Sequence, residues 1–271
     1  MNLFAEISGK TYRVDMHAAD ISIPLDFYGS QPNTYGLPVA SSAPFEGGGF
    51  VGDVRRGGSC NFETVTLTAH CNGTHTECVG HITEARISVH QRLEDTFIPA
   101  TLISVFPERA VKSQDTYRPQ FNADDLVITR NSMAEALAHA NRSFLDALII
   151  RTLPNEESKK SRDYMKKAPP FFSIEAMEMI RSYGVRHLLI DMPSVDRLFD
   201  EGILVAHHIF WEAETPHGEP GNAESRTRTI TEMIYVSDNI SDGSYLLNLQ
   251  IAPFVSDASP SRPRLFSVYR E

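Results

Sequence analysis

One short segment of the chain concentrates side chains that can bind a metal ion. Residues 69–81 read Ala-His-Cys-Asn-Gly-Thr-His-Thr-Glu-Cys-Val-Gly-His and include three histidines, two cysteines and a glutamate. Imidazole, thiolate and carboxylate are the side-chain ligands that zinc prefers. The segment therefore predicts a metal site. The alternative is a glycine-bearing loop whose histidines bond the backbone and whose cysteines are small buried apolar residues.

Alternation along an extended strand sorts these side chains by face. If the segment continues the strand expected before it, Cys71, His75 and Glu77 project to one side. His70 and Cys78 then project to the other side. This parity predicts the first three residues as a metal-binding triad and points His70 away from it.

The spacing of the segment excludes several other kinds of site. The sequence has no Cys-x-x-Cys pair, which argues against a structural zinc knuckle or a redox dithiol. It has no His-Glu-x-x-His and no Gly-x-Ser-x-Gly, which argues against a helix-borne metalloprotease site and a serine hydrolase. Cys71 beside a histidine could act as a thiolate nucleophile, and this alternative stays open.

Further candidate residues lie far downstream. Asp191 follows an apolar stretch, and the C-terminal end of such a strand commonly presents site residues. Asp196 is equally compatible with a turn or a helix cap, and His207 and His208 with a half-buried pair. Glu232 interrupts an apolar Ile-Thr-Glu-Met-Ile stretch, so it lies either on a solvent face or in a buried site as a ligand.

The elements that must position these residues are mostly strands. Apolar and β-branched patterns predict strands within 11–29 and at 62–69, 147–150, 185–191, 229–236 and 245–251. Helical spacing predicts helices at 123–140 and at 174–183, the second capped by Ser173 and ended by Gly184. Polar or Gly/Pro-bearing stretches predict loops at 29–58, 154–169 and 212–229. Together they predict one mixed α/β domain over residues 1–271.

Composition limits the partners of the chain. Its 271 residues carry a formal net charge of -10, which argues against binding to nucleic acid or to an anionic membrane. No apolar run approaches the roughly 18 residues that span a bilayer, and the N-terminal residues show no secretory signal. The three cysteines form an odd, clustered set, which favours a reducing cytoplasm over paired disulfides.

Read jointly, these residues resemble the cyclase/arylformamidase (kynurenine formamidase-like) family of metal-dependent hydrolases. The family motif is His-x-Gly-Thr-His-x-Asp-x-Pro-x-His, and residues 71–81 read Cys-Asn-Gly-Thr-His-Thr-Glu-Cys-Val-Gly-His. The resemblance also covers residues 20–25, 148–152 and 191–196, together with His207 and Glu232.

The resemblance implies a binuclear metal centre held by Cys71, His75, Glu77, His207 and Glu232. It also implies that His81, the last histidine of the motif, transfers protons. The expected ion is zinc, one or two per chain, with manganese as an alternative.

Three departures from the motif bear on that centre. Cys71 replaces a histidine, Glu77 replaces an aspartate and Val79 replaces a proline. A thiolate adds negative charge, which weakens the Lewis acidity of the ion, and its softness favours zinc. The extra methylene of Glu77 moves its carboxylate by about 1.5 Å, one carbon–carbon bond. His70 could replace the missing histidine, but parity favours Cys71.

The resemblance also implies a fold and an activity. The fold would be a swivelling β/β/α domain with a mixed sheet or partly closed barrel flanked by helices, assembled as a homodimer or homotetramer. The activity would be metal-dependent hydrolysis of an amide, formamide, lactam or lactone in a small molecule, with C–N bonds other than peptide bonds as the main targets. Residues 45–50 and Trp211 could wall a pocket for an aromatic substrate. The alternatives are a non-catalytic member with a degraded metal site and a cyclase of small-molecule biosynthesis.

Overall fold

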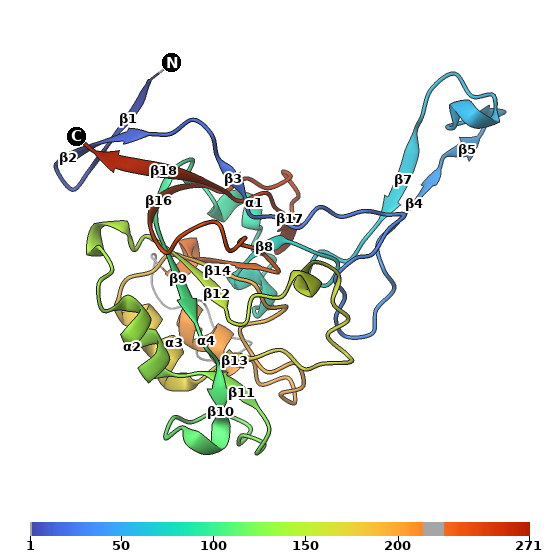
Figure 1. The fold of residues 1–271 in the computed structure, drawn as a ribbon. Helices are drawn as coiled ribbons and strands as arrows, with labels where there is room; N and C mark the ends of the chain where they lie inside the picture. The colour runs from blue at the N-terminus through green and yellow to red at the C-terminus, as the bar shows by residue number, and fades with distance from the viewer. Residues whose placement is uncertain (1, 214–224) are drawn as a thin grey trace.

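The computed structural model describes residues 2–213 and 225–271, and one large mixed sheet organises this part of the chain (Figure 1). The strand order is β1-β2-β18-β16-β9-β12-β14-β15-β8-β17, and β3 pairs with β18 beside that path. Neighbours β9, β12, β14 and β15 are parallel. The bounds are β1 Leu3–Ile7, β2 Lys10–Val14, β3 Ala19–Asp20, β8 His75–Cys78, β9 Ile98–Val105, β12 Ala147–Thr152, β14 His187–Ile190, β15 Thr229–Glu232, β16 Gly243–Asn248, β17 Ala258–Pro260 and β18 Arg264–Arg270. This sheet confirms the predicted mixed α/β class.

Alternating apolar side chains give the central strands two buried faces. Along β12, Leu148 and Ile150 join a core cluster on one face, whereas Ala147 and Ile149 join another cluster on the opposite face. Successive side chains of a strand point to opposite faces, so a strand buried on both needs a continuous apolar run. This is why the stretch predicted as a buried strand at 147–150 lies at the centre of the sheet.

Helices α2, α3 and α4 lie together against one face of the sheet (Figure 1). The bounds are α1 Val89–Arg92, α2 Arg130–Leu137, α3 Ile174–Ser182 and α4 Val205–Trp211. The 3-10 helices are η1 Val54–Arg56, η2 Val79–His81, η3 Ala110–Lys112, η4 Arg142–Phe144, η5 Glu157–Ser161 and η6 Ser225–Thr227. Helix α3 confirms the expected helix, because the Ser173 hydroxyl accepts a hydrogen bond from Ala176 N at 3.0 Å and Gly184 has a φ of 73°.

The predicted helix over 123–140 is wrong in its first part. Residues 126–128 form β11 (Leu126–Ile128), which pairs with β10 (Glu108–Arg109) and β13 (Phe171–Phe172). The helix begins only after Thr129, whose hydroxyl forms a capping box with Ser132. Pairing with two distant strands therefore displaces the helix start beyond the Asp-Asp pair at 124–125.

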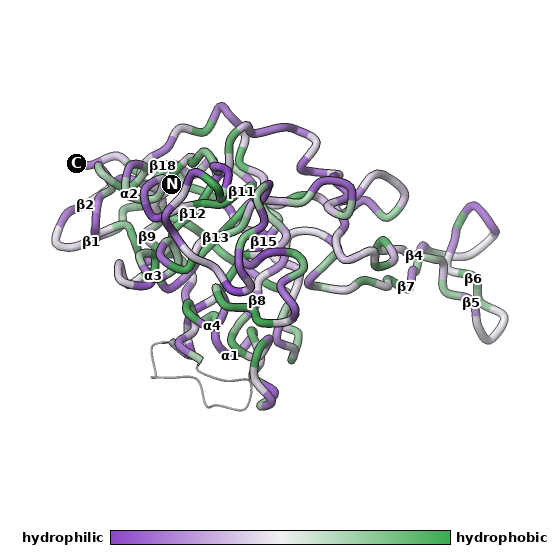
Figure 2. Tube along the Cα trace, turned by 90° about the horizontal axis from the view of Figure 1, so that it is seen from below, coloured by the Kyte–Doolittle hydropathy of each residue, from purple (hydrophilic) through white to green (hydrophobic). Residues whose placement is uncertain are grey.

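The predicted loop over 29–58 is also wrong in part, because much of it forms a projecting arm. The arm comprises β4 (Ser41–Pro44), β5 (Glu46–Gly47), β6 (Phe50–Val51) and β7 (Glu63–Thr66), with β4 paired to β7 and β5 to β6. Figures 1 and 2 both show it standing away from the body of the molecule. Short strands in Gly- and Ser-rich sequence carry little apolar alternation, which is why the pattern missed them.

The polar excursion over 154–169 contains one buried cation. Lys159 is 4% exposed, and its ammonium donates to Asp191 Oδ2 at 2.8 Å. Asp191 also accepts from the amide and hydroxyl of Thr152, so it ties the ends of β12 and β14 together. Asp191 is thus a structural residue at the ends of these strands.

The predicted loop over 212–229 falls largely on residues outside the described part. Among the described residues, no helix combines the length and apolar character needed to cross a membrane.

Candidate metal centre

Strand β8 lies between β15 and β17 and carries the centre of the site. In its antiparallel register with β15, His75 faces Glu232 and Glu77 faces Ile230. Within β8 the predicted alternation holds. Thr76 bonds across to Thr231 at 2.8 Å, on the other face from His75 and Glu77. The expected strand over 62–69 does not run into β8, however, because β7 ends at Thr66 and a turn intervenes.

The turn changes where His70 points. The amides of Cys71 and Asn72 both donate to Thr68 O, at 3.0 and 3.1 Å, which breaks the extended chain before β8. Strand parity therefore does not apply to His70, and the prediction that it points away is wrong. Its Nδ1 lies 2.9 Å from Glu77 Oε2, inside the site.

His75 has the environment of a metal ligand. Its Nδ1 lies 3.0 Å from the carbonyl oxygen of Gly73, which acts as acceptor and fixes the ring proton on that nitrogen. Its Nε2 is buried, has no hydrogen-bond partner among the described residues and lies 3.4 Å from Glu232 Oε2. A buried nitrogen lone pair facing a carboxylate is an unsatisfied arrangement that a cation between the two would satisfy.

His207 is oriented in the same way from helix α4. Its Nε2 lies 3.1 Å from Glu77 Oε1, and its Nδ1 lies 2.6 Å from Asp196 Oδ2. Asp196 also accepts from Ala206 N at 2.8 Å and from the Tyr117 hydroxyl at 2.7 Å. It therefore caps α4 and positions the imidazole at once, as carboxylates behind metal-binding histidines do.

His81 lies on the open side of the site, with His70. The two rings are 4.2 Å apart and inclined by 31°. His81 Nε2 lies 3.9 Å from Glu77 Oε2, and its Nδ1 lies 3.6 Å from Asp257 Oδ2. Asp257 was not predicted as a site residue. It precedes β17, and only the pairing of β17 with β8 brings it here, so no local sequence signal could have found it.

The two central carboxylates titrate in opposite directions. Burial raises the pKa of Glu77, but His81, His207 and His70 outweigh this and hold it well below its ordinary value. Burial and the charge of Glu77 raise the pKa of Glu232, against the effect of His75. Two neighbouring buried carboxylates whose pKa values shift in opposite directions are typical of a functional site.

Neighbouring carboxylates raise the pKa values of His70 and His207. Burial lowers the pKa of His70, yet hydrogen bonds to Asp257 and Glu77 raise it to about 10. Burial likewise opposes protonation of His207, but Asp196 and Glu77 raise its pKa well above the ordinary value. The neighbouring carboxylates therefore favour the charged form of both imidazoles.

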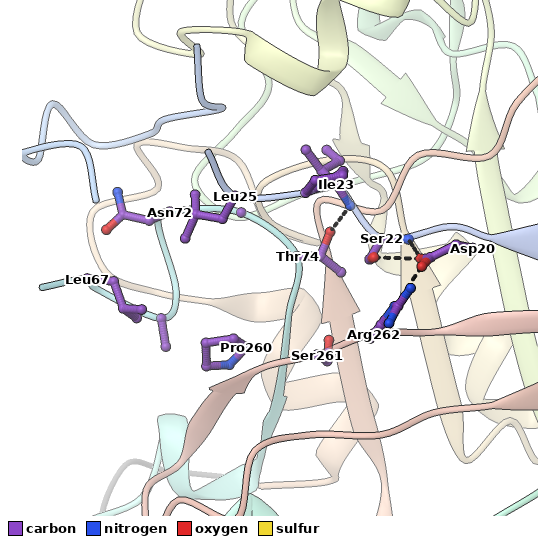
Figure 3. Close-up of a pocket in the computed structure, with 13 residues that line it drawn as sticks. Asp20, Ser22, Ile23, Leu25, Leu67, Asn72, Thr74, Pro260, Ser261 and Arg262 are labelled. Atoms are coloured by element: carbon purple, nitrogen blue, oxygen red, sulfur yellow. Dashed lines mark hydrogen bonds and ion pairs between the residues drawn. The ribbon is translucent and has the colours of Figure 1, made fainter. Parts of the chain in front are cut away.

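Thr74 ties the metal-binding segment to two distant parts of the chain. Its hydroxyl accepts from Ile23 N at 2.8 Å and donates to the carbonyl of Met233 at 2.5 Å. Thr74 also lines a cavity of about 310 Å³. Figure 3 shows it there, near the Asp20–Arg262 ion pair. Met233 adjoins Glu232 and has a φ of 52°, in the left-handed region, so this bond supports a strained backbone at the site.

The centre opens into a cavity of about 650 Å³. Tyr35 and Phe199 contact each other edge to face at its rim, with ring centroids 6.3 Å apart. The expectation that residues 45–50 and Trp211 wall this pocket is wrong. Residues 45–50 lie on the projecting arm, and Trp211 is a fully buried core residue.

The structure gathers all six predicted site residues, Cys71, His75, Glu77, His81, His207 and Glu232, around this cavity. Two groups of three donor residues have ligand atoms within 4.8 Å of one another. They are His75–Glu77–Glu232, here the inner group, and His70–Glu77–His81, here the outer group. Cys71 and His207 line the cavity, but neither belongs to either group in the described part of the chain, so their roles as ligands stay predictions.

Comparison with known proteins gives relatives at the level of sequence and fold. A kynurenine formamidase of Bacillus cytotoxicus is 27% identical over 207 residues, which is 76% of this chain and 79% of the relative. A solved structure of a potential metal-dependent hydrolase with cyclase activity has a TM-score of 0.59 and 17% identity, covering 93% of this chain and all of the other. An isatin hydrolase bound to the product analogue thioisatinate has a TM-score of 0.62 and 13% identity, covering 93% of each chain.

Comparison with protein families gives a further match. The Cyclase family, described as “Putative cyclase”, matches residues 19–197, more than half of the chain. That range contains the candidate metal-binding segment at residues 69–81 and the strands from β3 to β14. The chain belongs to the Cyclase family.

Proposed function

We propose that this chain is a metal-dependent hydrolase that cleaves a non-peptide C–N bond in a small aromatic molecule. The observation that carries the proposal is the buried group of His75, Glu77 and Glu232, whose ligand atoms lie within 4.8 Å of one another, together with His207, whose Nε2 lies 3.1 Å from Glu77 Oε1. Each of the two imidazoles directs one nitrogen inward and has the other held by an acceptor. Such fixed donors bind an ion without reorganisation.

Zinc suits this donor set, because imidazole and carboxylate are among its preferred ligands. Manganese is the alternative, and Cys71 would add a thiolate that favours zinc. When bound, the ion supplies Lewis acidity toward the substrate carbonyl and toward water. The number of ions per chain is part of the proposal, and the measurement of metal content described below tests it.

The residues of the chain then have separate tasks. Glu77 and Glu232 provide negative charge in a buried site, and His81 at the cavity wall transfers the proton to the leaving nitrogen. Tyr35 and Phe199 at the rim provide the apolar contact that an aromatic ring requires. The names of the relatives, a kynurenine formamidase and isatin hydrolases, support an aromatic amide or lactam as the substrate.

The thiol-enzyme alternative has weaker support. Burial, together with the charge of Glu232, raises the pKa of Cys71 to about 11. A thiol with a raised pKa is protonated at neutral pH and is a poor nucleophile. Cys78 is less suited still, because its thiol is buried against the backbone and contacts Ile87 O at 3.4 Å.

The test compares metal content and turnover. Protein purified without chelator, after chelation, and after addition of zinc or manganese is assayed with formanilide and isatin. We expect turnover to disappear on chelation and to return with the ion, and Glu232→Gln to lose both ion and activity. Glu178→Gln, on the exposed side of α3, is the matched control. Turnover unaffected by chelation would refute the proposal, whereas bound metal without turnover would favour the non-catalytic alternative.

His81 is tested separately. Because general acid–base catalysis contributes about 10²- to 10⁴-fold, His81→Ala should lower kcat by that factor. The ion of the inner group should remain, because His81 does not belong to that group. Loss of that ion together with activity would mean that His81 is a ligand of the inner ion.

A further inference from the structure

The cavity over the metal centre is lined by acidic side chains and, within the described part of the chain, by no lysine or arginine. Four of its lining residues carry carboxylates. They are Glu77 and Glu232 at the centre and Asp200 and Glu201, here the rim carboxylates. The residues outside the described part, Met1 and 214–224, have no lysine or arginine in their sequence. A single chain therefore brings neither of these cationic side chains to the cavity.

The central carboxylates have positively charged or metal-binding neighbours, whereas the rim carboxylates have none among the described residues. Glu77 and Glu232 lie beside imidazoles and beside the proposed ion, whose two positive charges balance theirs. Asp200 accepts instead from backbone amides, Gly202 N at 3.0 Å and Leu204 N at 2.6 Å. These bonds fix its carboxylate in place but add no compensating charge. The rim therefore stays negative when the centre is filled.

The arginine nearest to the rim in sequence is engaged elsewhere. Arg197 precedes Phe199 by two residues, and its guanidinium donates to Asp125 Oδ2 at 3.1 Å and to Gln120 O at 3.2 Å. It does not line the cavity. The planar guanidinium is the usual partner of a ligand carboxylate, because its two N–H groups match the two oxygens. The cavity lacks this partner for the carboxylate of an amino acid or another anionic substrate.

Two exposed aromatic rings stand with the rim carboxylates. Tyr35 is 41% exposed and Phe199 64% exposed, and the two rings contact each other edge to face. Burial and the charges of Glu232 and Asp200 raise the pKa of Tyr35, so the negative field of the site reaches this ring. The face of an aromatic ring attracts an organic cation. Aromatic faces beside uncompensated carboxylates thus suit an ammonium group on the ligand.

We propose that the substrate is an aromatic amide whose side chain carries an ammonium group and no carboxylate, and that Asp200 and Glu201 select it. The inference rests on the proposed function and narrows its substrate class. With the amide carbonyl at the metal centre, the side chain of the substrate extends to the rim, where an ammonium group finds opposite charge and aromatic faces. A carboxylate in the same place faces like charges without a cation, which excludes anionic competitors.

Three substrates of nearly equal size test the selection in the zinc-loaded enzyme. They are formanilides with an aminomethyl, hydroxymethyl or carboxymethyl group opposite the amide, so that a methylene separates the charge from the reacting bond. We expect kcat/KM to fall in that order and to differ by about tenfold or more between the cationic and the carboxylate substrate. This ratio should shrink between about 0.1 and 1 M salt, as the Debye length falls from about 10 to 3 Å.

Variants of the rim carboxylates assign the effect to residues. Glu201→Lys should lower the ratio by about fivefold or more, because it reverses one rim charge. Glu178→Lys, the same charge change on the exposed side of α3, should retain the ratio. Asp200→Asn should also lower it, with circular dichroism to establish that the variant is folded. Equal kcat/KM for the two charged substrates, or an unchanged ratio in both rim variants, would overturn the inference and leave the proposed function intact. Failure to cleave any of the three substrates would refute the proposed function.

Binding of the product amines gives a readout that does not require turnover. 4-Aminobenzylamine and 4-aminophenylacetate are titrated into the zinc-loaded protein, and their dissociation constants are measured by NMR. The cationic amine should bind about tenfold more tightly than the anionic one, and Glu201→Lys should remove most of the difference. Tighter binding of 4-aminophenylacetate to the wild type would overturn the inference.

Discussion

Replacement of Asp196 by asparagine isolates the role of a carboxylate that lies behind the metal centre. Asp196 Oδ2 accepts from His207 Nδ1 at 2.6 Å and from the His207 backbone N–H at 3.1 Å, and Oδ1 accepts from the Tyr117 hydroxyl and from Ala206 N. Asparagine has the same shape and can keep the Oδ1 bonds. Its NH2 group, however, would place a donor opposite both His207 Nδ1 and the His207 backbone N–H. The ring proton should then move to Nε2, the nitrogen that faces Glu77.

The size of the effect follows from that tautomer. To bind an ion through Nε2, His207 must return its proton to Nδ1 and leave two donors facing each other in a buried place. An unpaired buried donor costs about 1–3 kcal/mol. Loss of an outer partner of a metal ligand typically costs about 10–100-fold in affinity, or about 1.4–2.8 kcal/mol. The two arguments agree, so with His207 as a proposed additional ligand, Asp196→Asn should weaken zinc binding by about 10–100-fold.

The assay is competition between the protein and a chelator of known zinc affinity, at neutral pH. Circular dichroism establishes that the variant is folded, and histidine NMR reports the tautomer of His207. Asp124→Asn is the matched control, because this aspartate is exposed at the surface. A folded Asp196→Asn variant that binds zinc within threefold of the wild type would show that Asp196 only caps α4, and the account of His207 as an oriented ligand would be refuted.

Three further predictions concern other parts of the chain. Thr74→Val should lower the free energy of unfolding in urea by about 2–4 kcal/mol, because it leaves two buried backbone groups unpaired; equal stability of Thr74→Ser and Thr74→Val would contradict this. Phe199→Ala should raise KM for an aryl formamide by about two- to tenfold, the value of one aromatic contact, with little change in kcat; an equal fall in kcat would place Phe199 in the chemistry. His187 and Arg186 lower the pKa of Asp95, so its contribution to stability is present above pH ~4 and is lost as pH falls through the lowered pKa. The difference in urea midpoint between wild type and Asp95→Asn should therefore shrink toward acid pH, and a constant difference would contradict the assignment.

The parts of the fold that the sequence predicts well are those set by local interactions. Helix α3 follows from the Ser173 cap, the apolar spacing after it and the left-handed Gly184. The strand at 147–150 follows from an apolar run too short for a helix. Within β8, alternation alone places His75 and Glu77 on one face. In each case the determining contacts lie within a few residues.

The parts that the sequence does not predict depend on distant contacts. His70 points inward because a hydrogen-bonded turn interrupts the strand, and alternation cannot anticipate that turn. Asp257 joins the site from 187 residues beyond His70, through the pairing of β17 with β8. Residues 126–128 become a strand because β10 and β13 flank them. Periodicity contains no information on such partners, so these features require the assembled sheet.

The position of β8 between β15 and β17 has a consequence for the order in which the chain folds during synthesis. A ribosome releases the metal-binding segment long before residues 229–260, which supply both neighbours of β8. Until then, four residues that are fully buried in the final structure have unpaired backbone groups. Cys71 and Cys78 are accessible to oxidants and stray metal ions during that interval, although both thiols are buried afterwards. These two cysteines are thus most vulnerable before the site exists, and for them a reducing environment matters more in the nascent chain than in the finished protein, where only Cys60 is exposed.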